Sequence, residues 1–167
     1  YAIDNDIEAT EDIKKEWNML VKGVKPEAKN RSAVDALLTT KWNQNEPFNG
    51  MCPGGSMTGC GATAMAMVMK YWNWPAQGVG TNSYYENDYG NISVNFSATT
   101  YDWENMPYQI DKNSPQEQID AVALLGYHCG VSVEMMYDDD GTGSGAYSVD
   151  VPYALNKYFD YAPSNFR

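Results

Sequence analysis

Cys60 stands between two glycines at the point where a loop gives way to a helix. The loop, residues 54–59, is rich in glycine, whereas residues 62–72 are almost wholly apolar. A thiol at a helix N-terminus meets the positive end of the helix dipole and unpaired amides, which favour the thiolate. The same amides can stabilise an oxyanion once the thiolate has attacked a carbonyl carbon. The pattern therefore indicates a cysteine nucleophile, and the alternative is a buried cysteine that only fills space.

The general base is harder to place than the nucleophile. A cysteine nucleophile needs a base, which is usually a histidine. The chain contains one histidine, His128, and Cys129 follows it at once. No Asn or Asp that could orient the ring stands at a recognisable spacing from His128. We therefore expect His128 to lie at the end of a helix, bonded to backbone carbonyls, and not to act as the base for Cys60.

The cysteines and the histidine could also bind a metal, and two of the cysteines could form a disulfide. Cys52, Cys60, His128 and Cys129 lack the paired short spacings that zinc ligation requires, so we expect neither a metal nor a cofactor. Three cysteines is an odd number, which leaves at least one free thiol within a single chain. Whether Cys52 and Cys129 pair is left open at this point.

Composition narrows the class of protein. The 167 residues are 43% hydrophobic and 13% aromatic, which suffices for a folded core. Eleven basic residues against 22 acidic ones give a net charge of −11, which disfavours nucleic acid or an anionic membrane as a partner. The longest apolar run, residues 62–68, is far too short to span a bilayer.

Sequence periodicity predicts several helices and short strands behind an N-terminal helix. The predicted helices cover residues 10–22, about 61–72, 114–126 and 149–159, with short strands within 76–107 and a strand over 131–137. The second helix carries no polar stripe, so we expect it to be buried on every side. Ser114, Pro115 and Glu117 match a capping box at the start of the third helix.

Several ordered motifs resemble the streptopain family of papain-like cysteine peptidases. Residues 58–64 read Thr-Gly-Cys-Gly-Ala-Thr-Ala and lead to Met-Lys-Tyr at residues 69–71. Segments 37–42, 101–107 and 130–135 match in the same order, so the resemblance covers about residues 34–160. The chain departs from the family pattern at Gly61, where valine is frequent, and at Met67, where glutamine is frequent.

The resemblance implies an α+β papain-like cysteine peptidase fold that is incomplete in this chain. The central buried helix carrying the cysteine is present, whereas the C-terminal β-rich part is missing. Cys60 matches the family's nucleophile, and Ser144 matches a serine on the loop that lines the substrate cleft. Residues 1–33 correspond to a pro-segment tail and linker, and 34–167 to the N-terminal part of the peptidase domain. The family's catalytic histidine and the side chain that completes its oxyanion hole lie downstream.

The sequence therefore predicts a secreted or cell-surface cysteine endopeptidase that acts on peptides and proteins. Cys60 would attack the scissile bond, with a histidine supplied by the C-terminal part of the same enzyme as a cleaved second chain. The pro-segment would be an autoinhibitor, and the 167-residue chain alone would be inactive. The alternative is a catalytically inactive fragment or homologue that acts as a peptide- or protein-binding module.

Overall fold

The computed structural model describes residues 9–24, 35–138 and 143–162. The chain divides into two compact units, residues 1–36 and 37–167, which are taken separately here. The first unit contains helix α1 (Glu11–Val21). The second contains α2 (Cys60–Trp72), the strands β1 (Thr81–Glu86) and β2 (Gly90–Asn95), α3 (Gln116–Ser132) and α4 (Val151–Phe159), with four short 3₁₀ turns in its described part. No helix among the described residues is long and apolar enough to cross a membrane.

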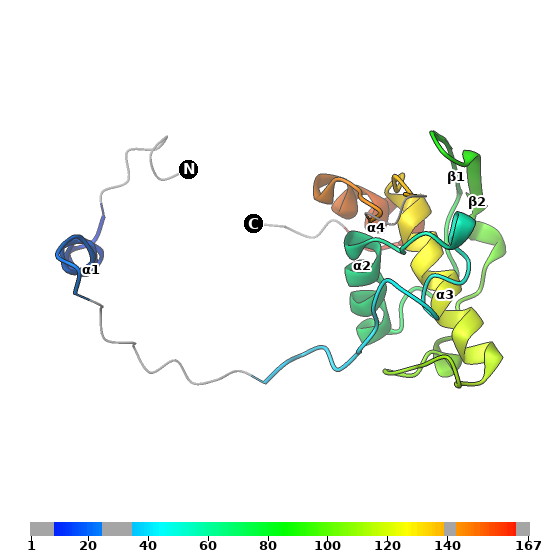
Figure 1. Ribbon diagram of the computed structural model, residues 1–167, viewed down its shortest axis with the longest axis horizontal. Helices are drawn as coiled ribbons and strands as arrows, with labels where there is room; N and C mark the ends of the chain where they lie inside the picture. The colour runs from blue at the N-terminus through cyan, green and yellow to red at the C-terminus, as the bar shows by residue number, and fades with distance from the viewer. Residues whose placement is uncertain (1–8, 25–34, 139–142, 163–167) are drawn as a thin grey trace. The chain divides into compact units, whose positions relative to one another are not determined.

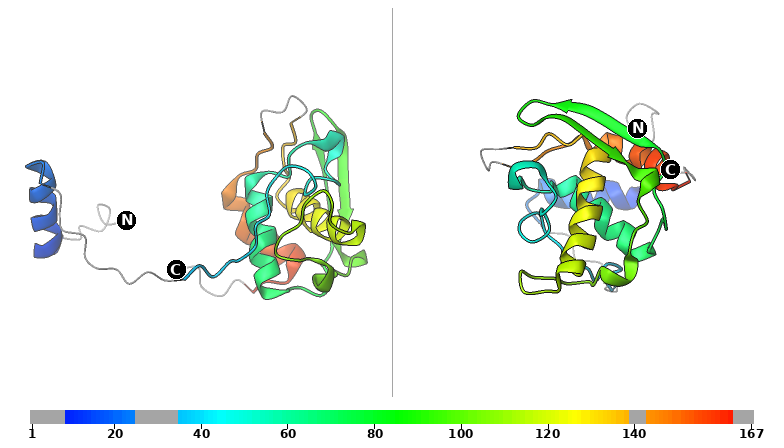
Figure 2. Two further views of the ribbon diagram at one scale, coloured as in Figure 1. Left: turned by 60° about the horizontal axis from the view of Figure 1, so that its bottom comes forward. Right: turned by 90° about the vertical axis from the view of Figure 1, so that its right-hand side faces the viewer.

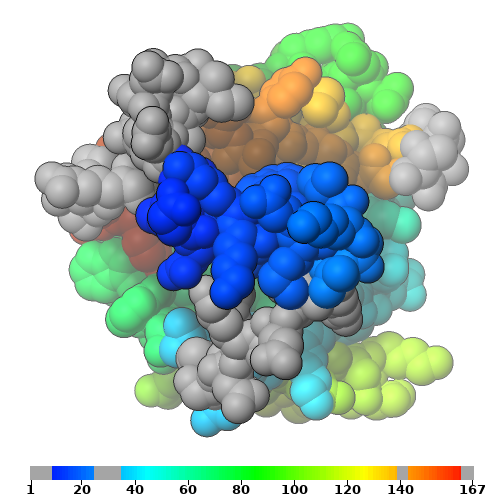
Figure 3. Space-filling model, turned by 90° about the vertical axis from the view of Figure 1, so that its left-hand side faces the viewer, coloured from blue at the N-terminus to red at the C-terminus, as the bar shows by residue number. Residues whose placement is uncertain are grey.

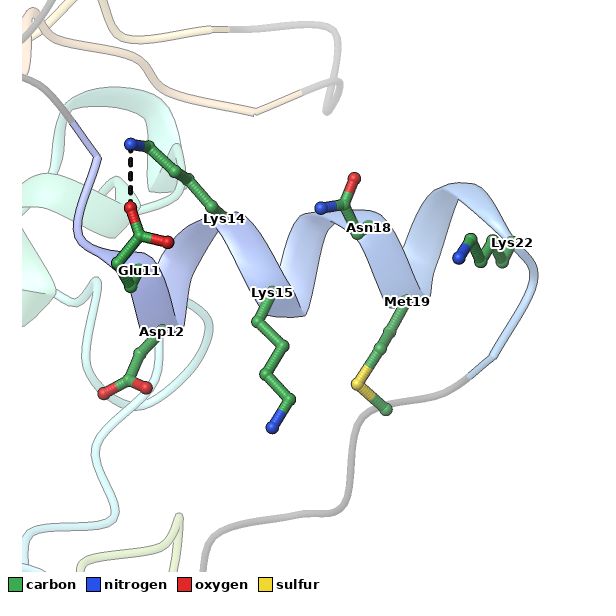
Figure 4. A pocket seen from close by; sticks show the side chains of 7 residues that line it. All are labelled: Glu11, Asp12, Lys14, Lys15, Asn18, Met19 and Lys22. Carbon is green, nitrogen blue, oxygen red and sulfur yellow. Dashed lines mark hydrogen bonds and ion pairs between the residues drawn. The ribbon is translucent and has the colours of Figure 1, made fainter.

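Helix α1 is amphipathic, as its sequence predicts. The Thr10 hydroxyl caps it by accepting a hydrogen bond from the Ile13 amide at 3.4 Å. One side of the helix carries charged residues, among them Glu11 and Lys14, whose side chains form an ion pair of 3.0 Å (Figure 4). Its apolar side chains Ile13, Trp17, Leu20 and Val21 are exposed, as is Val24 beyond the end of the helix. Figure 3 draws the helix in blue.

Helix α3 lies at the centre of the second unit. It packs against α2, against the β1–β2 hairpin and against α4 (Figures 1 and 2). Val122, Leu125 and Cys129 are buried within these contacts. The interior of the unit is thus organised around one long helix, with the hairpin as the whole of the described sheet.

The predicted end of this third helix near Gly126 is wrong, as is the predicted strand over 131–137. The helix continues to Ser132, and the segment that follows it forms only an isolated β-bridge between Met136 and Gly145. Gly126 has a packing role, because a Cβ atom there would lie 3.0 Å from the Thr58 methyl group. The glycine permits close approach of two segments and does not terminate the helix.

The predicted capping box is also absent. Helix α3 begins after Pro115 without a side-chain cap. The Ser114 hydroxyl instead accepts a hydrogen bond from the Asp111 amide at 3.0 Å. Ser114 therefore closes the turn that precedes the helix.

Helix α2 is not buried on every side, contrary to the prediction. Residues on one side of it, spaced mainly four apart, are exposed: Cys60, Ala64, Val68, Tyr71 and Trp72. We call these five residues the α2 stripe. Apart from its cysteine it consists of apolar or aromatic side chains, and the remaining helix faces pack into the core.

Hydrogen bonds fasten the C-terminal end of α2 to the segment around Trp103. The Lys70 ammonium is buried and donates to the Trp103 carbonyl at 2.7 Å. The Trp103 indole in turn donates to the Pro75 carbonyl at 2.8 Å, and the Trp42 indole donates to the Pro107 carbonyl at 3.0 Å. Motifs that are distant in the sequence therefore hold one another in place.

His128 lies within α3 and is buried. Its Nδ1 atom shares a hydrogen bond of 2.9 Å with the Tyr101 hydroxyl, and the Phe96 ring stands edge-on to the imidazole at 5.3 Å. The prediction of a helix-end histidine bonded to backbone carbonyls is therefore wrong. Burial lowers the pKa of His128 from 6.5 to about 4, because the core disfavours the charged ring.

We predict that Gly130→Ala destabilises the protein. A helical Gly→Ala exchange normally adds about 1 kcal/mol of stability. A Cβ atom at Gly130, however, would overlap the hydroxyl of the fully buried Tyr137. We expect the free energy of unfolding, measured by urea denaturation, to fall by about 1–3 kcal/mol. The matched control is Gly61→Ala in α2, where a Cβ atom meets nothing within 4 Å and no loss is expected.

We also predict that His128 makes the fold acid-sensitive. As the pH falls below 6.5 the unfolded chain binds a proton that the folded chain excludes down to about pH 4. The free energy of unfolding therefore decreases across that window. Between pH 7 and pH 5, His128→Gln should lose about 2 kcal/mol less than the parent in urea denaturation. Equal losses in the two proteins would contradict this role.

Candidate active site

Cys60 is the first residue of α2 and is exposed. The amide and the hydroxyl of Thr63 both bond to the Gly59 carbonyl at 3.0 Å, which closes the first turn. The amides of residues 60–62 precede this first bond and are not used within the helix. The thiol thus stands where backbone donors are available to an anion.

Gly59 joins Cys60 to the rest of the site. Its φ of +89° lies in the left-handed region, which favours glycine. A Cβ atom there would lie 2.5 Å from the Met135 methyl carbon and 3.4 Å from the Ser144 carbonyl oxygen. The missing side chain therefore lets the head of α2 press against two residues that are more than 70 positions away.

The Ser144 segment is pinned on both sides. Met136 and Gly145 exchange two backbone hydrogen bonds of 2.8 and 3.0 Å. The Gly143 amide donates to an Asp138 carboxylate oxygen at 3.0 Å. The Ser144 side chain is buried, and its hydroxyl has no hydrogen-bond partner among the described residues. The structure thus brings Ser144 beside the residue that precedes Cys60, with its backbone facing that residue.

The three thiols lie in different surroundings, and the described structure contains no disulfide between them. Cys52 is buried 3.9 Å from the Thr58 hydroxyl, and burial raises the pKa of its thiol to about 11. Cys129 is wholly buried against the Met69 sulfur at 3.6 Å, and burial raises the pKa of its thiol as well. Of the three, only Cys60 is open to solvent.

His128 does not serve as a base for Cys60, because its hydrogen bond to Tyr101 holds the ring within the core. The described residues also contain no group of three or more metal-ligating side chains. A cavity of about 180 Å³ lies along the glycine-rich loop before Cys60, with Tyr89 and Asp138 in its wall. The Tyr89 hydroxyl bonds to Ser56 at 2.9 Å and helps to shape that loop.

Sequence reasoning missed the parts played by Met135 and Tyr89. Both act through contacts between segments far apart in the chain, and neither residue type marks a site by itself. The close contact at Gly59 had one sequence signal, the glycine itself. The sequence does not reveal that Met135 and Ser144 are its neighbours.

Comparison with known proteins relates this chain to a family of cysteine peptidases. Residues 42–167 match the model of the Peptidase C10 family. The chain is 34% identical over 140 residues to the thiol protease/hemagglutinin PrtT of Porphyromonas gingivalis, covering 79% of this chain and 15% of that protein. It is 30% identical over 155 residues to streptopain of Streptococcus pyogenes, covering 78% of this chain and 38% of that protein.

Solved structures agree in fold. Active interpain A, a cysteine protease of Prevotella intermedia, matches with a TM-score of 0.71 and 40% identity, over 82% of this chain and 59% of its own. A prointerpain A fragment from the same organism matches with a TM-score of 0.72 and 34% identity, over 92% of this chain and 56% of its own. The expected α+β papain-like fold is thereby confirmed, and the chain spans less than two thirds of the length of each of these relatives. The family match over residues 42–167 places this chain in the Peptidase C10 family, that of streptopain.

Proposed function

We propose that this chain is the Cys60-bearing part of a cysteine endopeptidase. Cys60 attacks the carbonyl carbon of a scissile peptide bond, and the amides at the head of α2 donate to the resulting oxyanion. The observation that carries the proposal is the position of Cys60, an exposed thiol at the first residue of a helix, seated by a left-handed glycine.

The base is a histidine from the part of the enzyme downstream of residue 167. The chain's own histidine is committed to the core, so the proton acceptor must come from elsewhere. The α2 stripe supports this arrangement, because it leaves an apolar surface uncovered with Cys60 at its N-terminal end. A second part of the domain that packs on Val68 and Trp72 would bring its side chains over the thiol.

Ser144 lines the substrate cleft through its backbone. Its hydroxyl is enclosed, whereas its carbonyl oxygen faces the Gly59–Cys60 junction. A substrate that reaches the thiol would therefore meet the main chain of this segment. Ser144→Ala should accordingly leave kcat/KM within about twofold of the parent, because the hydroxyl makes no bond that the substrate could exploit.

Residues 1–33 form the tail of a pro-segment that acts as an autoinhibitor. Helix α1 supports this, since its apolar side, from Ile13 to Val21, is exposed and has the character of a docking surface. The match to prointerpain A extends over more of this chain than the match to active interpain A, 92% against 82%. A secreted or cell-surface location follows from the family resemblance as a prediction.

We predict that iodoacetamide at limiting concentration alkylates Cys60 selectively in the full-length protein. Cys52 and Cys129 are buried, and at pH 8 a thiol with a pKa of about 11 is ionised to roughly one part in a thousand. Peptide mapping by mass spectrometry gives the site of modification. Equal labelling of the three cysteines would favour a binding module over a peptidase.

We further predict that Cys60→Ala abolishes hydrolysis of a casein substrate by the full-length protein and leaves it folded. The matched control is Cys52→Ala, which removes a buried thiol and should retain turnover. Circular dichroism and urea denaturation establish folding for both variants. Retained turnover in the Cys60 variant would remove the assignment of the nucleophile.

A further inference from the structure

A second cavity, of about 260 Å³, lies between the β1–β2 hairpin and the segment that follows α3. Its walls are Tyr84, Tyr85 and Tyr147, and Tyr85 and Tyr147 are largely exposed. A volume below the usual 300–1,000 Å³ of small-molecule sites suits a single long side chain. The lining also includes three carboxylates and no basic residue: Glu86, Glu134 and Asp150.

Glu86 distinguishes this cavity from an ordinary acidic surface. Its side chain is only 5% exposed. One carboxylate oxygen, Oε2, accepts hydrogen bonds from the amides of Asp88 and Tyr89 at 2.8 and 3.0 Å. Among the described residues, the structure shows neither a cation beside Glu86 nor a bond to its other oxygen. This second oxygen is not fully enclosed by protein atoms, so a ligand in the cavity can contact it.

An organic cation fits this lining better than a metal ion does. The described carboxylates include no set of three metal-ligating side chains close enough to hold one ion. Aromatic rings around a carboxylate suit an ammonium or guanidinium group, which is attracted by both ring faces and the negative charge.

The cavity adjoins the candidate active site. Met136 lines it, while the preceding residue, Met135, packs against Gly59. The Tyr84 hydroxyl donates to the Met135 carbonyl at 2.7 Å, so one wall of the cavity is tied to a residue that packs against Gly59. Tyr147 follows Ser144 by three positions. A peptide that lies along the Ser144 segment would thus reach the cavity with a residue near the scissile bond.

We propose that this cavity is a substrate subsite for a lysine or arginine side chain, with Glu86 as the residue that determines the preference. This inference rests on the proposed peptidase function and adds the substrate class: peptides with a basic residue at one position removed from the scissile bond. Glu134 and Asp150 add negative potential at the rim and attract the same group.

Hydrolysis tests the preference directly. Peptides that differ only in Lys or norleucine at one position, scanned over four positions on either side of the scissile bond, are assayed with the full-length enzyme. We expect kcat/KM to favour Lys by about tenfold at one position, mainly through KM. Glu86→Gln should reduce that ratio to about one, because glutamine retains an oxygen for the two turn amides but carries no negative charge.

The matched control is Glu117→Gln, which removes the same charge from an exposed position in the first turn of α3 and should leave the ratio unchanged. If Glu86→Gln fails to fold, the double variant Glu134→Gln/Asp150→Asn replaces it, since neither residue is buried, and should lower the ratio severalfold. A ratio that is the same in these variants and in the control, or the absence of a lysine preference at every position, would overturn the proposal.

Binding without turnover separates this proposal from the peptidase function. Nα-acetyl-lysine methylamide and its norleucine analogue are titrated into full-length Cys60→Ala protein, with and without Glu86→Gln, and followed by NMR chemical shifts. We expect the lysine amide alone to shift resonances of Tyr84, Tyr85 and Tyr147, and the shifts to vanish with Glu86→Gln. If neither peptide is hydrolysed but these shifts occur, the peptidase function fails and the cation site stands. Identical titrations of the two amides refute the cation site whatever the activity.

Discussion

The close approach at Gly59 is the contact on which the arrangement of the site depends. The head of α2 reaches the Met135 methyl group and the Ser144 carbonyl because residue 59 has no side chain and adopts a left-handed backbone. That contact sets where the Cys60 thiol stands relative to the Ser144 segment. The Met136–Gly145 hydrogen bonds then fix the segment from its other side. A rigid helix, a glycine and a pinned loop together place a thiol beside main-chain polar groups, which is the preorganisation that covalent catalysis needs.

The opposite end of α2 is held by a different device. Lys70 donates to the Trp103 carbonyl and the Asn73 side chain, and its ammonium also lies 5.5 Å from the centre of the Tyr108 ring. All of these acceptors are uncharged, and burial lowers the pKa of Lys70 from its ordinary value. Trp103 continues the chain of contacts to Pro75. The helix that begins at Cys60 is therefore fastened at both ends.

These contacts show what the sequence could and could not predict. The helix behind Cys60 and the Thr10 cap were predictable, because each depends on neighbouring residues and on local propensity. The α+β class followed from the resemblance of ordered motifs to a known family. The end of α3 was not, since Gly126 packs against Thr58 and only the folded chain shows this partner. His128 was placed wrongly for the same reason, as its bond to Tyr101 joins α3 to a distant segment. The exposed side of α2 has no local signal, because an apolar residue looks the same whether its cover is present or not.

The α2 stripe links two properties that are usually independent. Cys60 stands on the same side of the helix as Val68 and Trp72, so any surface that shields the apolar residues from water also passes close to the thiol. The packing of that surface on α2 therefore affects both the solubility of the chain and the reactivity of the thiol. A chain whose stripe is uncovered would tend to self-associate through these apolar side chains. A chain whose stripe is covered gains solubility, and the covering surface also limits which molecules can reach the sulfur.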